Sequence, residues 1–199
     1  LGKRHFDVLL DMQASWRANL LAYVVNARRK IGFDQPRARN AQQMFINETI
    51  RGPHRVHVLD GFFQFVEALG LQGRELRWDI PVSEQERGRV EAWLPAASSC
   101  LVISPCSSAR ARNFRNWSAS SYAAVADYAY AQYGLELVLT GGQSDQERAY
   151  ADAIRAQTAT PVTDLVAKTT LKELYALLQR ATLFIGPDSG PLHMANAAG

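Results

Sequence analysis

The chain alternates short apolar runs with longer stretches in which apolar residues recur every three or four positions. The runs are typical of buried strands, and the spaced stretches are typical of helices that cover a sheet. This pattern predicts strands at residues 6–10, 29–33, 101–105, 135–140, 164–166 and 181–185. It predicts helices at residues 15–27, 38–45, 58–69, 118–133, 144–156 and 171–181, and another after residue 189. Repeated strand–helix units indicate an α/β fold with parallel sheets, which bind ligands at the carboxyl ends of their strands.

Cap residues support several of these helices. Gly70 and Gly134 follow predicted helices as C-caps. Thr170 is a candidate N-cap, and Glu173, three residues later, completes a capping box with it.

Residues 72–95 interrupt the regular pattern, because they are polar and contain Pro81, a charge run over residues 84–89 and Pro95. We therefore expect residues 1–80 to form one domain, 81–96 a linker with a short helix, and 97–199 a second domain. The first residue is Leu1, and the last predicted helix leads into no further strand. We expect the chain to be an internal piece of a longer protein, with an incomplete first domain and a second domain that is cut short.

The most informative stretch follows the strand predicted at residues 181–185. Gly186 breaks that strand, Ser189 stands at an N-cap position, and Pro191 suits the first turn of a helix. The free N–H groups of such a turn and the helix dipole favour an anion, and His193 adds a donor. Together with Gly190, these residues predict a site for a diphosphate.

Two further loops leave the carboxyl ends of predicted strands. Residues 104–117 combine hydroxyl and guanidinium groups suited to a diphosphate: Ser107, Ser108, Arg110, Arg112 and Arg115. The alternative is a solvated basic loop. After the strand at residues 135–140, Gly141 and Gly142 would allow a ligand near the backbone, although paired glycines also form ordinary turns.

Three polar side chains are candidates for contacts with hydroxyl groups. Gln143 or Asp145 would bind a ribose or another sugar, and Asp188, at a strand end, would accept from a sugar hydroxyl or else cap its own loop. No Asp-x-Asp pair and no His-rich cluster has the spacing of a metal site, so we expect no metal and no cofactor. Protein donors and a helix terminus would then balance the charge of a departing diphosphate.

The composition fits a globular protein, with 47% hydrophobic and 21% charged residues among 199. No apolar run approaches the roughly 20 residues that cross a bilayer. The two cysteines, Cys100 and Cys106, form neither a disulfide framework nor a zinc pattern, which favours the cytoplasm. Cys106 would be a nucleophile only with a partner base, which the neighbouring sequence does not supply, so a buried thiol is the simpler interpretation.

The net charge of +3 is unevenly distributed. Basic residues crowd the first forty positions: Lys3, Arg4, Arg17, Arg28, Arg29, Lys30, Arg37 and Arg39. Such a surface suits an acidic partner, a phosphorylated lipid head group or nucleic acid, or is simply solvated. No RNP-like aromatic motif or zinc finger accompanies the charge, so we expect no nucleic-acid partner.

The motifs resemble those of glycosyltransferase family 9, the ADP-heptose:lipopolysaccharide heptosyltransferases, over nearly the whole chain. Asp164-Leu165, Lys168-Thr169 and Glu173-Leu174 are similar to the family run D-L-x-G-K-T-x-L-x-E-L, except that Ala167 replaces the glycine. Asp188-Ser189-Gly190-Pro191 with His193 is similar to its D-S/T-G-P-x-H motif. Asp11, Gln13 and Arg17 resemble the D-x-Q-x-x-x-K motif of the first half.

The resemblance implies a GT-B architecture of two Rossmann-like domains and an inverting, metal-independent transfer of heptose from ADP-heptose to the lipopolysaccharide inner core. Arg115, Ser189, Gly190 and His193 would hold the donor diphosphate, Asp188 the sugar, and Gln143 or Asp145 the nucleoside. Ser107, Ser108 and Gly142 complete the expected donor site. On the acceptor side the resemblance implies Gln13, Arg17, Arg37 and Arg39, in contact with lipopolysaccharide core or lipid A.

The family's general base is an Asp that would lie before Leu1, so the catalytic residue is not assigned within this chain. A lipid acceptor also implies peripheral contact with the inner face of the inner membrane. Two alternatives remain at this point. One is another GT-B nucleotide-sugar enzyme, with a different hexose or an epimerase activity, and the other is a nucleotide-binding module without catalysis.

Overall fold

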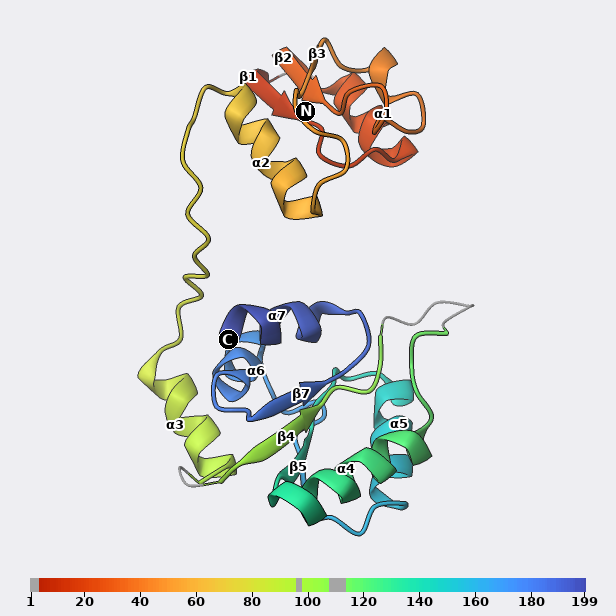
Figure 1. Ribbon diagram of the computed structural model, residues 1–199, viewed down its shortest axis with the longest axis vertical. Coiled ribbons are helices and arrows are strands. Elements are labelled where there is room, and N and C mark those ends of the chain that lie inside the picture. Colours follow the sequence, from red (N-terminus) through yellow and green to blue (C-terminus); the bar gives the residue numbers. More distant parts are fainter. Residues whose placement is uncertain (1–3, 96–97, 108–113) are drawn as a thin grey trace. The chain divides into compact units, whose positions relative to one another are not determined.

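The computed structural model describes residues 4–95, 98–107 and 114–199. Contacts along the chain divide it into two units, Leu1–Leu76 and Arg77–Gly199, and each is described by itself (Figure 1). Both units contain a parallel sheet, so the predicted α/β class is confirmed. No helix in the described ranges is long and apolar enough to cross a membrane.

The first unit is built on three parallel strands in the order β1-β2-β3. Its strands are β1 (His5–Leu10), β2 (Asn26–Gly32) and β3 (Glu48–Thr49), and its helices are α1 (Trp16–Val24) and α2 (Val58–Ala68). Ile31, Ile50 and Phe65 form the buried core of the unit, and residues from β1 and the end of α2 pack around them. Because the three strands are parallel, their carboxyl ends form one edge of this sheet.

Of the predicted helices of the first unit, one is shorter than expected and one is wrong. The helix expected over residues 15–27 ends at Val24, because the chain enters β2 at Asn26, which pairs with His5 of β1. The helix expected over residues 38–45 is only a short 3-10 turn, Gln42–Met44. Asn40 and Ala41 have φ values of 53° and 56°, in the left-handed region, and such residues cannot continue a right-handed helix.

The second unit contains four parallel strands in the order β6-β5-β4-β7. They are β4 (Cys100–Ile103), β5 (Glu136–Leu139), β6 (Val162–Asp164) and β7 (Leu183–Ile185). The chain adds β5 and β6 on one side of β4 and then returns to place β7 on the other side. The strand order thus reverses between β4 and β7, and in open α/β sheets such a switch point marks the ligand-binding crevice.

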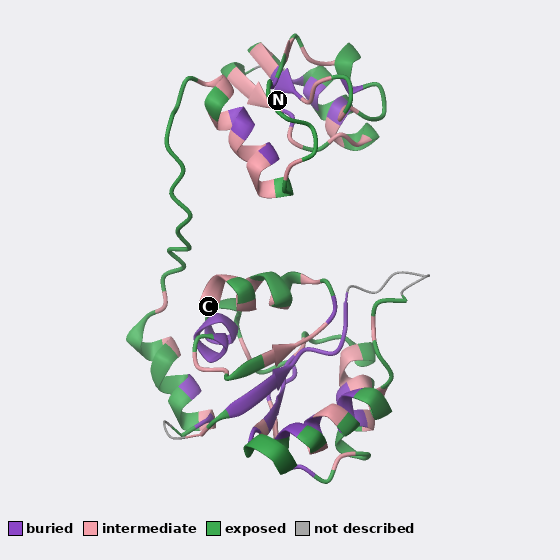
Figure 2. Ribbon diagram, viewed as in Figure 1, coloured by how far each residue is buried: buried purple, intermediate pink, exposed green. Residues whose placement is uncertain are grey.

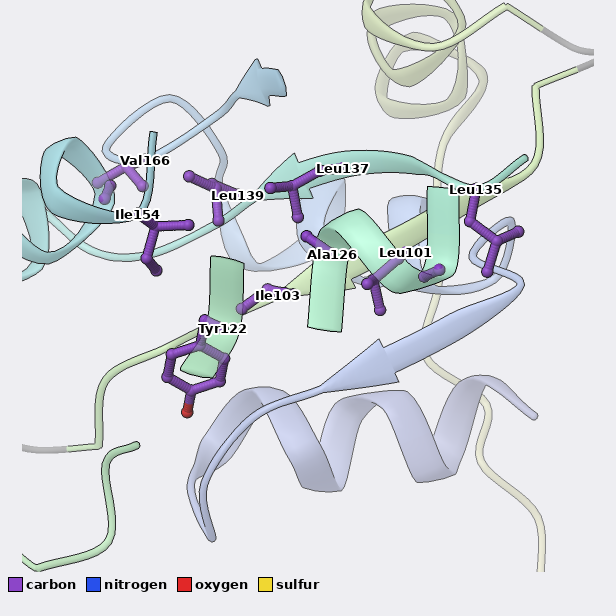
Figure 3. Close-up of a cluster of buried hydrophobic side chains, with 11 residues drawn as sticks. Leu101, Ile103, Tyr122, Ala126, Leu135, Leu137, Leu139, Ile154 and Val166 are labelled. Carbon is purple, nitrogen blue, oxygen red and sulfur yellow. The ribbon is translucent and has the colours of Figure 1, made fainter. Parts of the chain in front are cut away.

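Helices cover both faces of this sheet, so the unit has three layers (Figure 1). The helices are α3 (Glu84–Trp93), α4 (Ala119–Tyr133), α5 (Asp145–Arg155), α6 (Leu171–Leu178) and α7 (Gly190–Ala198). Leu101 and Ile103 of β4 face α4 and α5, where Tyr122 and Ile154 complete one buried cluster (Figure 3). Cys100 and Val102, the alternate positions, face the cluster formed by α3, α6 and α7. β4 is therefore buried on both faces (Figure 2).

Most predicted elements of the second unit are confirmed, with shifted ends. Gly134 ends α4 with φ 67°, and the capping box of Thr170 and Glu173 opens α6. β6 lies two residues earlier than expected, and α6 ends at Leu178 rather than Ala181. β7 is at the edge of the sheet, so Leu183 is 45% exposed and the strand is less buried than its apolar sequence predicts.

The short helix expected within the linker at residues 81–96 is α3, which groups with the second unit. Ser83 caps α3 and forms a capping box with Glu86. Val90 and Leu94 are buried against Leu174 and Leu177 of α6. The division between the units falls between Leu76 and Arg77, upstream of the helix.

Candidate functional site

A cavity of about 420 Å³ lies at the carboxyl ends of the strands of the second unit. Loops that follow all four strands contribute to its wall, as expected for the ligand-binding edge of a parallel sheet. The lining residues are Ser104, Cys106, Ser107, Gly141, Gly142, Ser144, Gln146, Glu147, Thr169, Thr170, Leu171, Leu174, Ser189, Gly190 and Pro191. Two of the predicted loops and the predicted helix start are thus brought together around one hollow.

Close approach of β7 to β4 places the start of α7 beside this cavity. The Ser104 N–H donates to the carbonyl of Ile185 at 3.1 Å. A Cβ atom on Gly186 would lie 2.9 Å from the Ser104 carbonyl oxygen, so a side chain here would force the two loops apart. Glycine at this position therefore allows the loop after β7 to approach the loop after β4 at the switch point.

The start of α7 is open toward an anion. Ser189 is the N-cap residue, with φ −158°, but its side chain makes no cap hydrogen bond among the described residues. Its hydroxyl donates instead to the carbonyl of Pro187 at 3.1 Å. A helix of nine residues that begins with Gly190 and Pro191 leaves its first N–H groups for a ligand.

Arg115, Asp188 and His193 meet at the entrance to this helix. Arg115 Nη1 donates to the backbone carbonyl of Asp188 at 2.9 Å and lies 3.5 Å from its carboxylate Oδ2. His193 Nε2 lies 3.5 Å from the other carboxylate oxygen, Oδ1. The side chains of Asp188 and His193 are 68% and 76% exposed, so both lie at the rim and neither lines the cavity. Two potential cations therefore flank one carboxylate beside the helix N-terminus.

Gly142 lines the cavity, but its N–H has a partner within the protein. It donates to Glu147 Oε1 at 2.8 Å, and Glu147 Oε2 accepts from the hydroxyl of Ser144 at 2.6 Å. Glu147 thus fixes the loop after β5. Gln143 and Asp145 are exposed and lie outside the cavity wall.

The loop after β4 contributes Ser107 and Cys106. Asn116 Oδ1 accepts from the Ser107 N–H at 2.9 Å and from its hydroxyl at 3.0 Å, which ties the two ends of the loop together. Burial, with a smaller contribution from Glu147, raises the pKa of Cys106 to about 11. A thiol with this pKa stays protonated at neutral pH, which agrees with its interpretation as a buried thiol. Ser108, Arg110 and Arg112 lie outside the described residues.

The sequence pattern does not predict the part of the cavity wall that follows β6. Thr169, Thr170 and Leu171 follow β6 and line the hollow, as does Glu147 at the start of α5. The signal was present in the Lys168-Thr169 motif and in the capping box. β6 is only three residues long and ends at Asp164, two residues before its predicted end, so the loop that lines the cavity begins earlier than the sequence pattern indicates.

The predicted acceptor residues of the first unit differ in their surroundings. Gln13, Arg17 and Arg39 are exposed, and Gln13 lines a hollow of about 320 Å³ beside α1. Arg37, by contrast, has a side chain only 14% exposed, and its guanidinium donates to Asp34 at 2.7 Å and to Gln64 at 2.5 Å.

Arg37 also stabilises the charged form of its neighbour Asp34. Its hydrogen bond, with a further contribution from His54, holds the pKa of Asp34 below its ordinary value. Arg37 therefore has a structural role that its sequence context did not indicate. Among the residues that the structure describes, no group of three His, Cys, Asp or Glu side chains could hold a metal ion.

A parallel sheet with helices on both faces, and a cavity at the switch point beside a helix N-terminus, defines the Rossmann-like α/β class, whose members bind ligands at this edge. Comparison with known proteins places the chain more narrowly. The sequence profile of glycosyltransferase family 9 (heptosyltransferase) matches residues 1–199, and the chain belongs to this family.

Curated relatives share this assignment. The chain is 35% identical over its whole length to lipopolysaccharide core heptosyltransferase OpsX of Haemophilus influenzae, of which it covers 56%. It is 30% identical over 99% of its length to lipopolysaccharide heptosyltransferase 3 of Escherichia coli, of which it covers 58%. The chain thus spans little more than half the length of these relatives.

Solved structures show the same fold. The crystal structure of a family 9 glycosyl transferase from Veillonella parvula matches 99% of the chain with a TM-score of 0.75 and 22% identity, over 56% of that structure. The E. coli heptosyltransferase WaaC with ADP-2-deoxy-2-fluoro heptose matches 98% of the chain with a TM-score of 0.70 and 18% identity, over 59% of its length. The predicted GT-B class, with two Rossmann-like units, is therefore confirmed.

Proposed function

We propose that the protein is an inverting, metal-independent glycosyltransferase that moves a heptose from ADP-heptose to the inner core of lipopolysaccharide. Its membership of the heptosyltransferase family and relatives named as lipopolysaccharide heptosyltransferases support this reaction. The observation that carries the proposal is the cavity beside the uncapped start of α7, with Arg115 and His193 at its rim.

The donor diphosphate lies against the N-terminus of α7 in this proposal. The N–H groups that follow Ser189 donate to its oxygens, and Arg115 and His193 reach it from the rim. Asp188 accepts a hydrogen bond from a hydroxyl of the sugar. Either Gln143, in the loop after β5, or Asp145, at the start of α5, binds the nucleoside, and both are exposed. Ser107, with both of its donors used by Asn116, shapes the wall.

Transfer then proceeds by in-line displacement. A general base, which we assign to no residue of this chain, takes the proton of the acceptor hydroxyl. The hydroxyl oxygen forms a bond to the anomeric carbon as the bond from that carbon to the diphosphate breaks, which inverts the configuration. The electron pair leaves with ADP. The helix N-terminus, Arg115 and His193 stabilise its charge in the role that a metal ion fills elsewhere.

We assign the acceptor to the first unit, where residues 1–76 carry eleven Lys and Arg against seven Asp and Glu. Arg17 and Arg39, with exposed side chains, meet acidic groups of the lipopolysaccharide core or lipid A, and the exposed Gln13 lies four residues before Arg17 in the sequence. α1 also exposes Trp16, Leu20 and Tyr23 by 61%, 62% and 67%. Aromatic and aliphatic side chains next to arginine suit a membrane interface, so we place the protein in the cytoplasm with peripheral contact at the inner membrane.

A transfer assay with the full-length protein tests the reaction. With a lipid A acceptor that carries the inner-core sugars, we expect product from ADP-heptose, little product from UDP-glucose, and the same rate in excess EDTA. NMR of the new linkage should show the anomeric configuration opposite to that of the donor. Equal use of UDP-glucose would favour a different hexosyltransferase. ADP binding without any turnover would favour a nucleotide-binding module.

Vesicle sedimentation tests the membrane contact separately. Leu20→Glu should reduce binding to vesicles of phosphatidylethanolamine and phosphatidylglycerol, because it places a charge in the apolar surface of α1. Tyr128→Glu, which alters an exposed tyrosine of α4 in the other unit, is the matched control. Equal sedimentation of both variants and the unchanged protein would exclude α1 as the contact.

A further inference from the structure

One wall of the nucleotide cavity depends on a helix that does not line it. Thr169, Thr170 and Leu171 form the part of the wall that follows β6, and they lead directly into α6. α3 lies outside the wall but packs on α6 through Val90 and Leu94. The sequence between the two units runs straight into α3, whose N-cap is Ser83.

Glu173 holds the start of α6 in place. Its Oε2 accepts from the Thr170 N–H at 2.7 Å, while the Thr170 hydroxyl accepts from the Glu173 N–H at 3.2 Å. The Glu173 side chain is only 3% exposed, so its charge has little access to solvent. A buried carboxylate needs partners for both oxygens, because an unpaired buried charge is strongly unfavourable.

Arg89 of α3 supplies the second partner. Its Nη1 donates to Glu173 Oε1 at 2.9 Å, across 84 positions in the sequence. The Thr170 backbone N–H, followed by the Thr170 hydroxyl and Arg89, holds the pKa of Glu173 below its ordinary value, so the carboxylate stays charged. Without Arg89, one carboxylate oxygen loses its partner, and the bond to Thr170 weakens as Glu173 turns toward water or takes up a proton.

We propose that Arg89 is a positioning residue of the nucleotide cavity, which acts through Glu173 to hold the wall formed by Thr169, Thr170 and Leu171. The inference rests on the proposed binding of a nucleotide in this cavity. It makes α3 part of the binding machinery, although no residue of α3 lines the cavity. It also means that the Arg89–Glu173 ion pair connects the donor site to α3, the first helix of the second unit.

Calorimetric titration of the intact protein with ADP tests this role. Arg89→Met should weaken ADP binding about threefold to tenfold, the range of a coupling through one contact. Arg89→Lys should restore most of the affinity, since an ammonium can still reach Glu173. Arg87→Met is the matched control. Arg87 lies on the same helix with a half-exposed side chain, its Nε is 4.0 Å from Glu84 Oε1, and its substitution should leave binding within about twofold.

Two further readouts separate this role from general destabilisation. In the transfer assay, Arg89→Met should raise KM for ADP-heptose by the same factor as it weakens ADP binding and leave kcat unchanged, because the lost interaction serves binding and not the reacting bonds. Hydrogen exchange of the Thr170 N–H should be about tenfold faster in Arg89→Met than in Arg87→Met.

Each outcome decides one claim. If the unchanged protein binds ADP and Arg89→Met binds it equally well, the role of Arg89 is overturned. If the unchanged protein does not bind ADP, the proposed function fails. The exchange rate of the Thr170 N–H then still decides whether Arg89 holds the wall, and an unchanged rate overturns the inference.

Discussion

The guanidinium of Arg115 donates to the backbone carbonyl of Asp188 at 2.9 Å, although the two residues are 73 positions apart. This bond joins the loop after β4 to the loop after β7 across the switch point. The same guanidinium lies 3.5 Å from the Asp188 carboxylate, and His193 approaches that carboxylate from the other side at 3.5 Å. Asp188 thus contacts the same two side chains, Arg115 and His193, that reach the donor diphosphate in our proposal.

Asp188→Asn should therefore strengthen the binding of ADP. A carboxylate about 5 Å from a phosphate at an exposed site costs about 1 kcal/mol, so ADP should bind about threefold to tenfold more tightly to the variant at low salt. Transfer of heptose should nevertheless fall, because the variant loses its acceptor for the sugar hydroxyl. Calorimetry with ADP and the transfer assay measure the two effects. Weaker ADP binding in the variant would show that Asp188 does not compete with the diphosphate.

Ala167 is the next test, because it has a φ of 63° in the loop between β6 and α6. An L-residue in this conformation destabilises the folded protein by about 1 kcal/mol. Glycine removes this strain, but part of the gain is lost because glycine also makes the unfolded chain more flexible. We expect Ala167→Gly to raise the free energy of unfolding by about 0.5 kcal/mol in urea denaturation. Ala156→Gly, at the end of α5, is the control and should lower it. Destabilisation by Ala167→Gly would mean that the left-handed conformation is not strained.

Cys106 should be unreactive at neutral pH. Burial raises its pKa from 9.0 to about 11, so the thiolate fraction near pH 7.5 is about a hundredfold lower than for an ordinary thiol. Iodoacetamide should modify Cys106 at least tenfold more slowly in the folded protein than in guanidinium, as peptide mass spectrometry can measure. Cys106→Ala should retain transfer. Fast modification of the folded protein, together with loss of transfer in Cys106→Ala, would return Cys106 to the role of nucleophile.

Arg37 and Arg39 should differ in what their substitution changes. Arg37→Met removes the partner of Asp34 and of Gln64, and we expect it to lower the free energy of unfolding by about 2 kcal/mol. Arg39→Met should change stability by less than about 0.5 kcal/mol but raise KM for the lipid acceptor. Urea denaturation and the transfer assay distinguish the two. Equal effects of both variants on KM, with no loss of stability in Arg37→Met, would restore Arg37 as an acceptor contact.

The helices and strands of the second unit are predicted well because short stretches of sequence specify where they begin and end. The apolar run of β4, the Gly134 cap of α4 and the capping box of Thr170 and Glu173 each specify structure within a few residues. The carboxyl-end loops could then be placed on one edge from the alternation of strands and helices. That placement brought Ser107, Gly142, Ser189 and Gly190 to one cavity.

Contacts between residues far apart in the chain determine the features that the sequence pattern does not predict. The helix expected at residues 38–45 fails because Gln42 is buried and donates to the Asp11 carbonyl at 2.9 Å, which holds the loop in a left-handed turn. Arg37 looks like any basic residue in sequence, and only its contact with Asp34 shows that it is structural. The ion pair of Arg89 and Glu173 spans 84 positions and has no local pattern.

The central claim is that the start of α7 holds the donor diphosphate, and calorimetric titration of the protein and of His193→Ala tests it most directly. The ligands are ADP-heptose, ADP and UDP-glucose, and Asn196→Ala, an exposed change one turn further along α7, is the control. We predict a preference for the two ADP ligands, about tenfold weaker binding in His193→Ala and unchanged binding in Asn196→Ala. Binding of ADP-heptose that is equal in His193→Ala and in the unchanged protein would contradict this account and place the diphosphate elsewhere.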